Sequence, residues 1–265
     1  MAKSKNLLAF LYFLGLFFLL ACSSQEQSLA RVFSPELKEK KFYINDNISC
    51  LIYYNDQELE YIAKAIKNDL FKINQDLKEI FEVKDLINLE IVLIDQDIYH
   101  LKTGTPKWVF AFYHKSRIYI KVDPGLLVDS ESFYRTLKHE YVHFLTDNLS
   151  AGNIPVWFDE GLAKWIEDPR ITYEKEFFKD WTRNNSLFST QELNKSFTVL
   201  EGERSKMAYL YAKLLVARII NKHQTNQISN YLRMLSINKE LAFINTFRVK
   251  EESFITEANK IFTKN

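Results

Sequence analysis

The chain has 265 residues, of which 47% are hydrophobic and 26% are charged, and its formal net charge is +1. This much apolar material can form one sizeable core, so we expect a single domain built of two lobes. The near-zero net charge, without a basic stripe, argues against a nucleic-acid partner.

The N-terminus has the pattern of a targeting segment rather than of a folded element. Lys3 and Lys5 supply positive charge, and residues 7–20 form an apolar run that is short for a membrane-spanning helix. Leu-Leu-Ala-Cys follows at residues 19–22. This resembles a bacterial lipobox, in which the cysteine is lipidated and becomes the first mature residue.

We therefore expect a lipoprotein signal peptide over residues 1–21, lipid on Cys22, and a flexible tether over residues 22–40. The lipid would anchor the protein to a membrane of the bacterial cell envelope, at its periplasmic or extracellular face. The alternative is an uncleaved membrane anchor, or an ordinary secretory signal with a coincidental cysteine. Either would also place the rest of the chain outside the cytoplasm.

The next segment predicts strands beside one long helix. Residues 41–54 read as one or two strands, and Cys50 within them has no intramolecular disulfide partner if Cys22 carries lipid. We expect Cys50 to be a buried, unreactive thiol. Residues 56–81 carry apolar side chains at every third or fourth position, which predicts an amphipathic helix. Residues 89–94 predict a compact apolar strand.

Residues 108–113 and 117–122 predict a β-hairpin around the turn His114-Lys115-Ser116.

A helix with two histidines is predicted next. Residues 129–132 offer capping side chains and early negative charge, and residues 148–152 contain helix breakers. His139 and His143 lie four residues apart and share one helical face, so both imidazoles can reach one metal ion. Glu140 points about a quarter-turn away, where its carboxylate can act on a metal-bound water. The alternative is an ordinary amphipathic helix.

The segment that follows predicts a second helix, and a catalytic zinc site needs a third protein ligand. Residues 154–165 read I-P-V-W-F-D-E-G-L-A-K-W; Pro155 suits the first helical turn, and Pro169 limits the far end. Glu160 lies in an otherwise apolar stretch, where an uncompensated carboxylate would be costly. Spacing alone does not choose between Glu160 and Asp159.

From about residue 205 the chain is predicted to be helical again. We therefore expect an α+β fold, with a small N-terminal mixed sheet and a long helix, then the two site helices and a helical C-terminal part. The N-lobe would span about residues 41–150 and the C-lobe about residues 151–265.

A helix with H-E-x-x-H, a short turn and a second helix reading W-F-D-E-G-L-A resembles the gluzincin metallopeptidases. The similarity is greatest to the bacterial peptidase-MA-like group and more distant to thermolysin and the zinc aminopeptidases, and it covers most of residues 41–260. It implies a zincin-like fold, one Zn²⁺ per chain bound by His139, His143 and Glu160, and Glu140 as general base. In this family the glutamate of the E-G pair is the third ligand, which selects Glu160 over Asp159.

The resemblance also implies an oxyanion donor from the downstream helical region. Tyr209 occupies a matching place, with Tyr211 and then His223 as alternatives, although tyrosines on an apolar helix are more often core residues. Glu167 lies two turns after Glu160 on the same side, so it is a candidate partner for a zinc-bound imidazole. Lys164 stands where thermolysin relatives have an acidic residue, so that support must come from elsewhere.

In gluzincins a sheet edge beside the zinc helix pairs with an extended peptide substrate. Residues 108–112 or 117–122 could form this edge, and both could instead be internal. The chain lacks the G-A-M-E-N-like segment with which aminopeptidases hold a free amino terminus, so endopeptidase action on a peptide or protein substrate is favoured.

Two other functions remain open. One is a non-enzymatic zinc-binding lipoprotein that serves as a binding or scaffold module, and the other is an amidase acting on cell-wall peptide. The oligomeric state is not indicated by the sequence.

Overall fold

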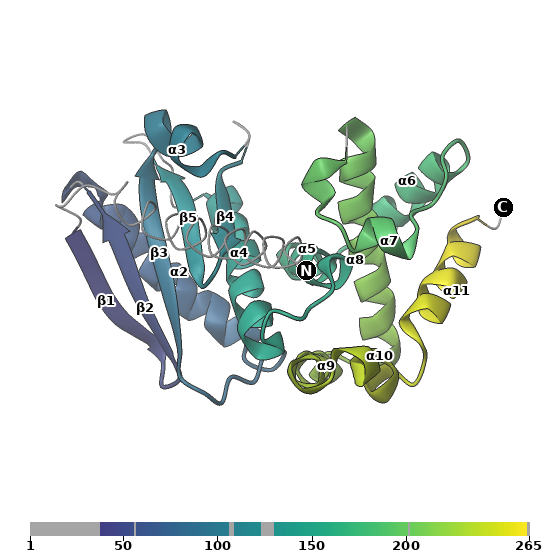
Figure 1. Cartoon of the computed structure of the whole chain (residues 1–265). Coiled ribbons are helices and arrows are strands. Elements are labelled where there is room, and N and C mark those ends of the chain that lie inside the picture. The colour runs from purple at the N-terminus through teal and green to yellow at the C-terminus, as the bar shows by residue number, and fades with distance from the viewer. Residues whose placement is uncertain (1–37, 56, 106–108, 123–129, 201, 264–265) are drawn as a thin grey trace, which may run out of the picture.

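The structure is a computed structural model that describes residues 38–55, 57–105, 109–122, 130–200 and 202–263 (Figure 1). The expected signal peptide, Cys22 and nearly all of the expected tether lie outside the described residues, as do Trp108 and residue 129. The first strand begins at Lys38, within the last part of the expected tether.

Five strands form one mixed sheet in the order β1-β2-β3-β5-β4. Strands β2 and β3 are parallel, as are β3 and β5, whereas β1 pairs with β2 and β4 pairs with β5 in the antiparallel sense. The small N-terminal mixed sheet predicted from the sequence is thereby confirmed. The strands are β1 (Lys38–Asn45), β2 (Ile48–Tyr54), β3 (Ile87–Asp95), β4 (Ala111–His114) and β5 (Arg117–Val122).

The predicted hairpin is present as β4 and β5. Its register pairs His114 with Arg117 across a two-residue turn. Lys115 and Ser116 have positive φ angles of 48° and 63°, as a tight turn that matches the sheet twist requires. Residues 117–122, one of the two candidates for the sheet edge, form an internal strand because β3 and β4 flank them. Strand β4 lies at the edge and begins three residues later than the strand expected from residue 108.

Helices α2 (Glu60–Leu77) and α4 (Glu131–Ser150) cover one face of the sheet, as Figure 1 shows. The long amphipathic helix predicted from residue 56 is α2, preceded by the short 3₁₀ turn Gln57–Leu59. Its apolar side chains pack with those of the strands, including Cys50, which is 1% exposed. Burial raises the pKa of the Cys50 thiol, as expected for an unreactive side chain.

The opposite sheet face is covered over only part of its area by helix α3 (Gln96–Thr103). There, Tyr99 packs with Tyr119 and with the outward side chains of β3. Helix α3 was not predicted, because its apolar side chains do not share one face: Tyr99 is fully buried whereas Leu101 is 85% exposed.

The second half of the described chain is helical, as predicted. Helix α5 (Val156–Glu167) packs between α4 and α8, and α9 also contacts α4. Pro155 is the N-cap residue of α5, one position before the expected first turn. The other helices are α6 (Thr172–Thr182), α7 (Thr190–Leu193), α8 (Gly202–His223), α9 (Asn226–Ile237), α10 (Lys239–Phe247) and α11 (Glu251–Thr263), with a 3₁₀ turn at Phe197–Val199.

Together these elements confirm the predicted α+β fold, with the helical part on the β4 side of a small sheet (Figure 1). Within the described part of the chain, every helix is too short or too polar to cross a lipid bilayer.

Candidate metal centre

Helix α4 carries both histidines of the H-E-x-x-H motif on a rigid support. Ser130 caps the helix, since its hydroxyl oxygen accepts the backbone N–H of Phe133 at 3.1 Å. At the other end Ala151 adopts a left-handed conformation with φ 50°. Buried side chains before and after the motif, including Phe133, Leu137 and Phe144, hold the helix in the core. The capped, buried helix therefore fixes the backbone from which the imidazoles project.

Helix α5 brings the third candidate ligand to the same place, and Gly161 is the reason it can approach α8 so closely. A Cβ atom at position 161 would lie 2.3 Å from the carbonyl oxygen of Ala212 and 2.6 Å from its carbon. A side chain would therefore push α5 away from α8. The glycine of the E-G pair thus sets the position of Glu160 immediately before it.

Three ligand atoms converge between the helices. The Nε2 atoms of His139 and His143 are 3.1 Å apart, and Oε2 of Glu160 lies 3.7 Å from each of them. Ligands around a tetrahedral zinc ion with bonds of about 2.0–2.1 Å are roughly 3.4 Å from one another. The donor set and its spacing therefore fit one zinc ion. The three side chains are 11–22% exposed, so a bound ion would keep limited access to solvent.

The electrostatics of the cluster also favour a cation. Burial lowers the pKa of His143, but the negative charges of Asp159 and Glu160 outweigh it and raise this pKa to about 10. Burial raises the pKa of Glu160, but its contacts with His139 and His143 lower it overall. The surroundings thus stabilise positive charge at this point, which a divalent ion would supply.

Asp159 contacts His143 on the side away from the ligand cluster. Its Oδ2 accepts the Nδ1–H of His143 at 2.8 Å, and its Oδ1 accepts the hydroxyl of Thr146 at 2.5 Å. A proton fixed on Nδ1 leaves the Nε2 lone pair directed into the cluster. Sequence reasoning weighed Asp159 only as a rival ligand to Glu160, and it missed this supporting role.

Glu167 lies beside His139, as its position two turns after Glu160 led us to expect. Its Oε2 is 3.3 Å from Nδ1 of His139 and 2.8 Å from Nζ of Lys164. Burial raises the pKa of Glu167, but His139 and Lys164 outweigh this and lower it to about 2. Lys164, which departs from the thermolysin pattern, therefore shares the Glu167 carboxylate with His139.

Glu140, the expected general base, is 7% exposed and follows His139 on the same helix. The half-buried Tyr209 lies on α8, and burial together with the charges of Glu160 and Glu140 raises its pKa. The charges of both site carboxylates thus act on the expected oxyanion donor.

The two alternatives to Tyr209 lie elsewhere. Tyr211 is fully buried, stacks on Phe178 at 4.9 Å, and donates its hydroxyl to Asn259 of α11. His223 is the last residue of α8 and packs against Phe247 at 5.3 Å. Of the three candidates, only Tyr209 has a pKa that the charges of Glu160 and Glu140 help to raise.

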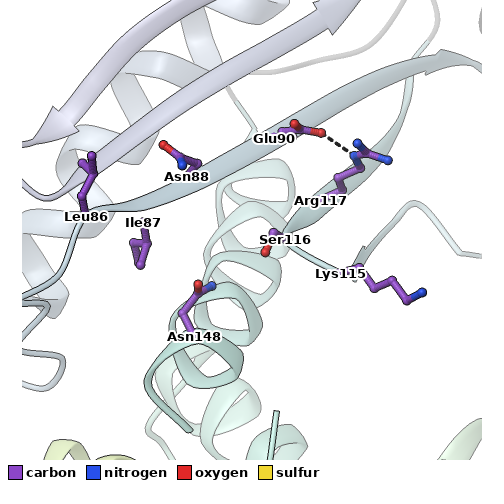
Figure 2. A pocket seen from close by; sticks show the side chains of 8 residues that line it. All are labelled: Leu86, Ile87, Asn88, Glu90, Lys115, Ser116, Arg117 and Asn148. Carbon is purple, nitrogen blue, oxygen red and sulfur yellow. Dashed lines mark hydrogen bonds and ion pairs between the residues drawn. The ribbon is translucent and has the colours of Figure 1, made fainter. Parts of the chain in front are cut away.

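A pocket of about 350 Å³ opens elsewhere, at the start of β3 (Figure 2). The turn between β4 and β5 and Asn148 near the end of α4 also border it, and an ion pair between Glu90 and Arg117 lies on its wall. None of the candidate ligands lines this pocket, so it is separate from the metal centre.

The fold and the cluster define a helix-based centre with two histidines and one carboxylate that could hold a metal ion. Residues 89–246, more than half of the chain, match the family model of the Peptidase MA superfamily. The chain belongs to this family. No curated protein sequence matches the chain. The matched segment contains the three candidate ligands, Glu140 and Tyr209. Strands β1 and β2 and helices α2 and α11 lie outside it.

Proposed function

We propose that the chain is a zinc-dependent metallopeptidase that hydrolyses peptide bonds with Glu140 as the general base. The observation that carries this proposal is that the ligand atoms of His139, His143 and Glu160 all lie within 4.8 Å of one another. Glu140 is buried next to them.

The chemistry divides between the ion and the side chains. A zinc ion bound by the three ligands would polarise the scissile carbonyl and make a nearby water more acidic. Glu140 accepts the proton of the attacking water and passes it to the departing amine. Asp159 orients the imidazole of His143 from behind, and the Glu167 carboxylate lies 3.3 Å from Nδ1 of His139. Burial of Glu140 keeps bulk water from competing for its carboxylate, which strengthens its interaction with the attacking water.

Tyr209 is proposed as the donor that stabilises the developing oxyanion. Its raised pKa keeps the hydroxyl protonated at neutral pH, so the side chain can donate a hydrogen bond. Its ring packs edge-on against Phe197 at 5.1 Å, which restricts the direction of the hydroxyl.

The proposed substrate is an extended segment of a peptide or protein. Strand β4 is at the sheet edge and contacts α4, so it can offer main-chain hydrogen bonds beside the cluster. Endopeptidase action is favoured by the absence from the sequence of a segment that would hold a free amino terminus.

The proposed location is the cell envelope, with lipid on Cys22 as the anchor. The support is the sequence pattern of residues 1–22: two lysines, an apolar run and a cysteine. Incorporation of labelled palmitate into the wild-type chain, and its loss in Cys22→Ser, is the expected result. Unlabelled wild-type protein would contradict the anchor.

The function is tested with Glu140→Gln, which keeps the size of the side chain but removes the base. We expect wild-type protein to cleave peptides, chelation to abolish cleavage, and the variant to lose about 10²–10⁴-fold in kcat while keeping its zinc. Glu79→Gln, at an exposed glutamate in the turn just after the end of α2, is the matched control.

Three results would contradict the proposal. Activity that survives both the substitution and chelation would refute the mechanism. Full zinc occupancy without cleavage of any peptide in a broad library would favour the non-enzymatic alternative. Cleavage of isolated cell-wall polymer but not of proteins would favour the amidase.

A further inference from the structure

Thr146 lies three residues after the second histidine of the motif and is fully buried. We infer that Thr146 is a positioning residue of the metal centre, which holds Asp159 so that His143 and Glu160 keep their places around the ion. This inference rests on the metal-binding part of the proposed function and not on catalysis.

The hydroxyl of Thr146 has two oxygen atoms within reach but only one proton to donate. Oδ1 of Asp159 lies at 2.5 Å, and the carbonyl oxygen of His143 lies at 3.0 Å. The carboxylate is charged and closer, and the carbonyl can accept a backbone N–H four residues further along the helix. The threonine proton therefore belongs to Asp159.

With this bond, both oxygens of the Asp159 carboxylate are engaged. Oδ2 accepts from Nδ1 of His143 at 2.8 Å, while Oδ1 accepts from Thr146. Two acceptor bonds fix the plane of the carboxylate, and that plane fixes the orientation of the imidazole ring. Without Thr146, the carboxylate could rotate about its side-chain torsion and the ring could follow it.

The same bond joins the two helices that carry the ligands. Thr146 and His143 belong to α4, whereas Asp159 belongs to α5 and is followed immediately by Glu160. The hydroxyl of Thr146 thus adds a second bond from α4 to the residue before Glu160, beside the direct bond between His143 and Asp159. Its loss should disturb the spacing of His143 and Glu160, and not only the stability of α4.

The competing interpretation is that Thr146 merely satisfies its own hydroxyl by bonding to the carbonyl of His143, as helical threonines often do. In that case its replacement would change stability alone. The two interpretations differ in one measurable quantity, which is the affinity for zinc.

The experiment measures the zinc affinity of the full chain by competition with a coloured chelator, and the melting temperature of the metal-free form. Thr146→Val keeps the shape and removes the hydroxyl, and we expect it to weaken zinc binding about tenfold or more. Thr146→Ser restores the hydroxyl and should return the affinity to within about threefold of wild type. Thr246→Val is the matched control, because Thr246 is a buried threonine whose hydroxyl makes no hydrogen bond.

A double-mutant cycle sharpens the assignment. In an Asp159→Ala background, Thr146→Val should cause no further loss of zinc affinity, since the bond partner is already absent. If Thr146→Val does not fold, Thr146→Cys, with its weaker donor, should fold and show an intermediate loss.

Wild-type zinc affinity in folded Thr146→Val or Thr146→Cys would overturn the inference, even if the metal-free variant melts at a lower temperature. A chain that binds zinc but cleaves nothing would refute the proposed catalysis and leave this inference standing. A wild-type chain that binds no zinc would refute both.

Discussion

The two histidines of the candidate centre are supported in different ways. His143 donates to Asp159 at 2.8 Å, and the second oxygen of this aspartate is held by the uncharged Thr146. His139 lies 3.3 Å from Glu167, whose carboxylate also contacts Lys164 at 2.8 Å and Arg135 at 3.5 Å. One support is a short chain of directed hydrogen bonds, and the other is a carboxylate shared with two cations.

The difference teaches that one centre combines geometric and electrostatic support. The Asp159 carboxylate forms hydrogen bonds with His143 and with the uncharged Thr146. Its negative charge is therefore not shared with a lysine or arginine in these bonds, and it orients the His143 ring strongly. The negative charge of Glu167 is largely compensated by Lys164 and Arg135, so less of it reaches His139. We therefore expect the His143 side to control metal affinity more than the His139 side.

The largest effect is expected from Gly161→Ala, which would break both supports together, because Asp159, Glu160 and Glu167 all lie on α5. The added Cβ would overlap the backbone of Ala212 at 2.3 Å. We expect a loss of about 3 kcal/mol in unfolding free energy, measured by denaturant titration, and weak zinc binding.

Gly104→Ala is the control for this substitution, since Gly104 has a φ of 68° but no atom within 4 Å of an added Cβ. It should cost about 1 kcal/mol of stability through backbone strain alone, and leave zinc affinity unchanged. Unaltered zinc affinity in Gly161→Ala would mean that the α5–α8 contact does not set the ligand positions.

The comparison itself is tested by Asp159→Asn beside Glu167→Gln, two substitutions that each exchange a carboxylate for an amide. We expect the first to weaken zinc binding about 10–100-fold and the second by less than about tenfold. Competition with a chelator at constant pH measures both. Equal losses, or a larger loss in Glu167→Gln, would show that the supports are not different in kind.

The smallest effect is expected from Lys164→Gln, which removes one of the cations that share Glu167. The carboxylate could then act more fully on His139, and a positive charge near the ion would be gone. We expect zinc to bind about twofold to fivefold more tightly, in line with the energy of a partly exposed ion pair. Weaker binding would instead show that Lys164 is needed to hold Glu167 in place.

Much of the candidate site could be predicted from the sequence, because its residues recur at helical spacing on two helices. His139 and His143 share a face at a separation of four residues, and Glu167 follows Glu160 by two turns on the same side. The α+β order was also predictable, since the apolar residues of α2 recur at helical spacing and residues 89–94 form a compact apolar run.

The remaining features depend on contacts that no local pattern encodes. Asp159 and Glu160 are neighbours in the sequence, and only the crossing of α5 over α4 shows which one contacts the back of His143. A single threonine inside a helix gives no signal of its own. Helix α6 escaped prediction because Phe178 is buried while Tyr173 and Phe177 are exposed, so its apolar residues do not follow one face.

Which strand forms the sheet edge could not be predicted from the sequence either. Residues 117–122 have the alternation expected of a half-buried strand, whether internal or at an edge. Their position between β3 and β4 follows from a parallel pairing with residues far earlier in the chain. Such long-range pairing is decided by the assembled core rather than by the strand itself.

The most direct test of the central claim is anomalous X-ray diffraction at the zinc edge, on crystals of the chain purified with its metal. The account predicts one strong peak per chain, about 2.0–2.2 Å from Nε2 of His139, Nε2 of His143 and a carboxylate oxygen of Glu160. The absence of a peak at this position, or a peak that excludes Glu160, would contradict it.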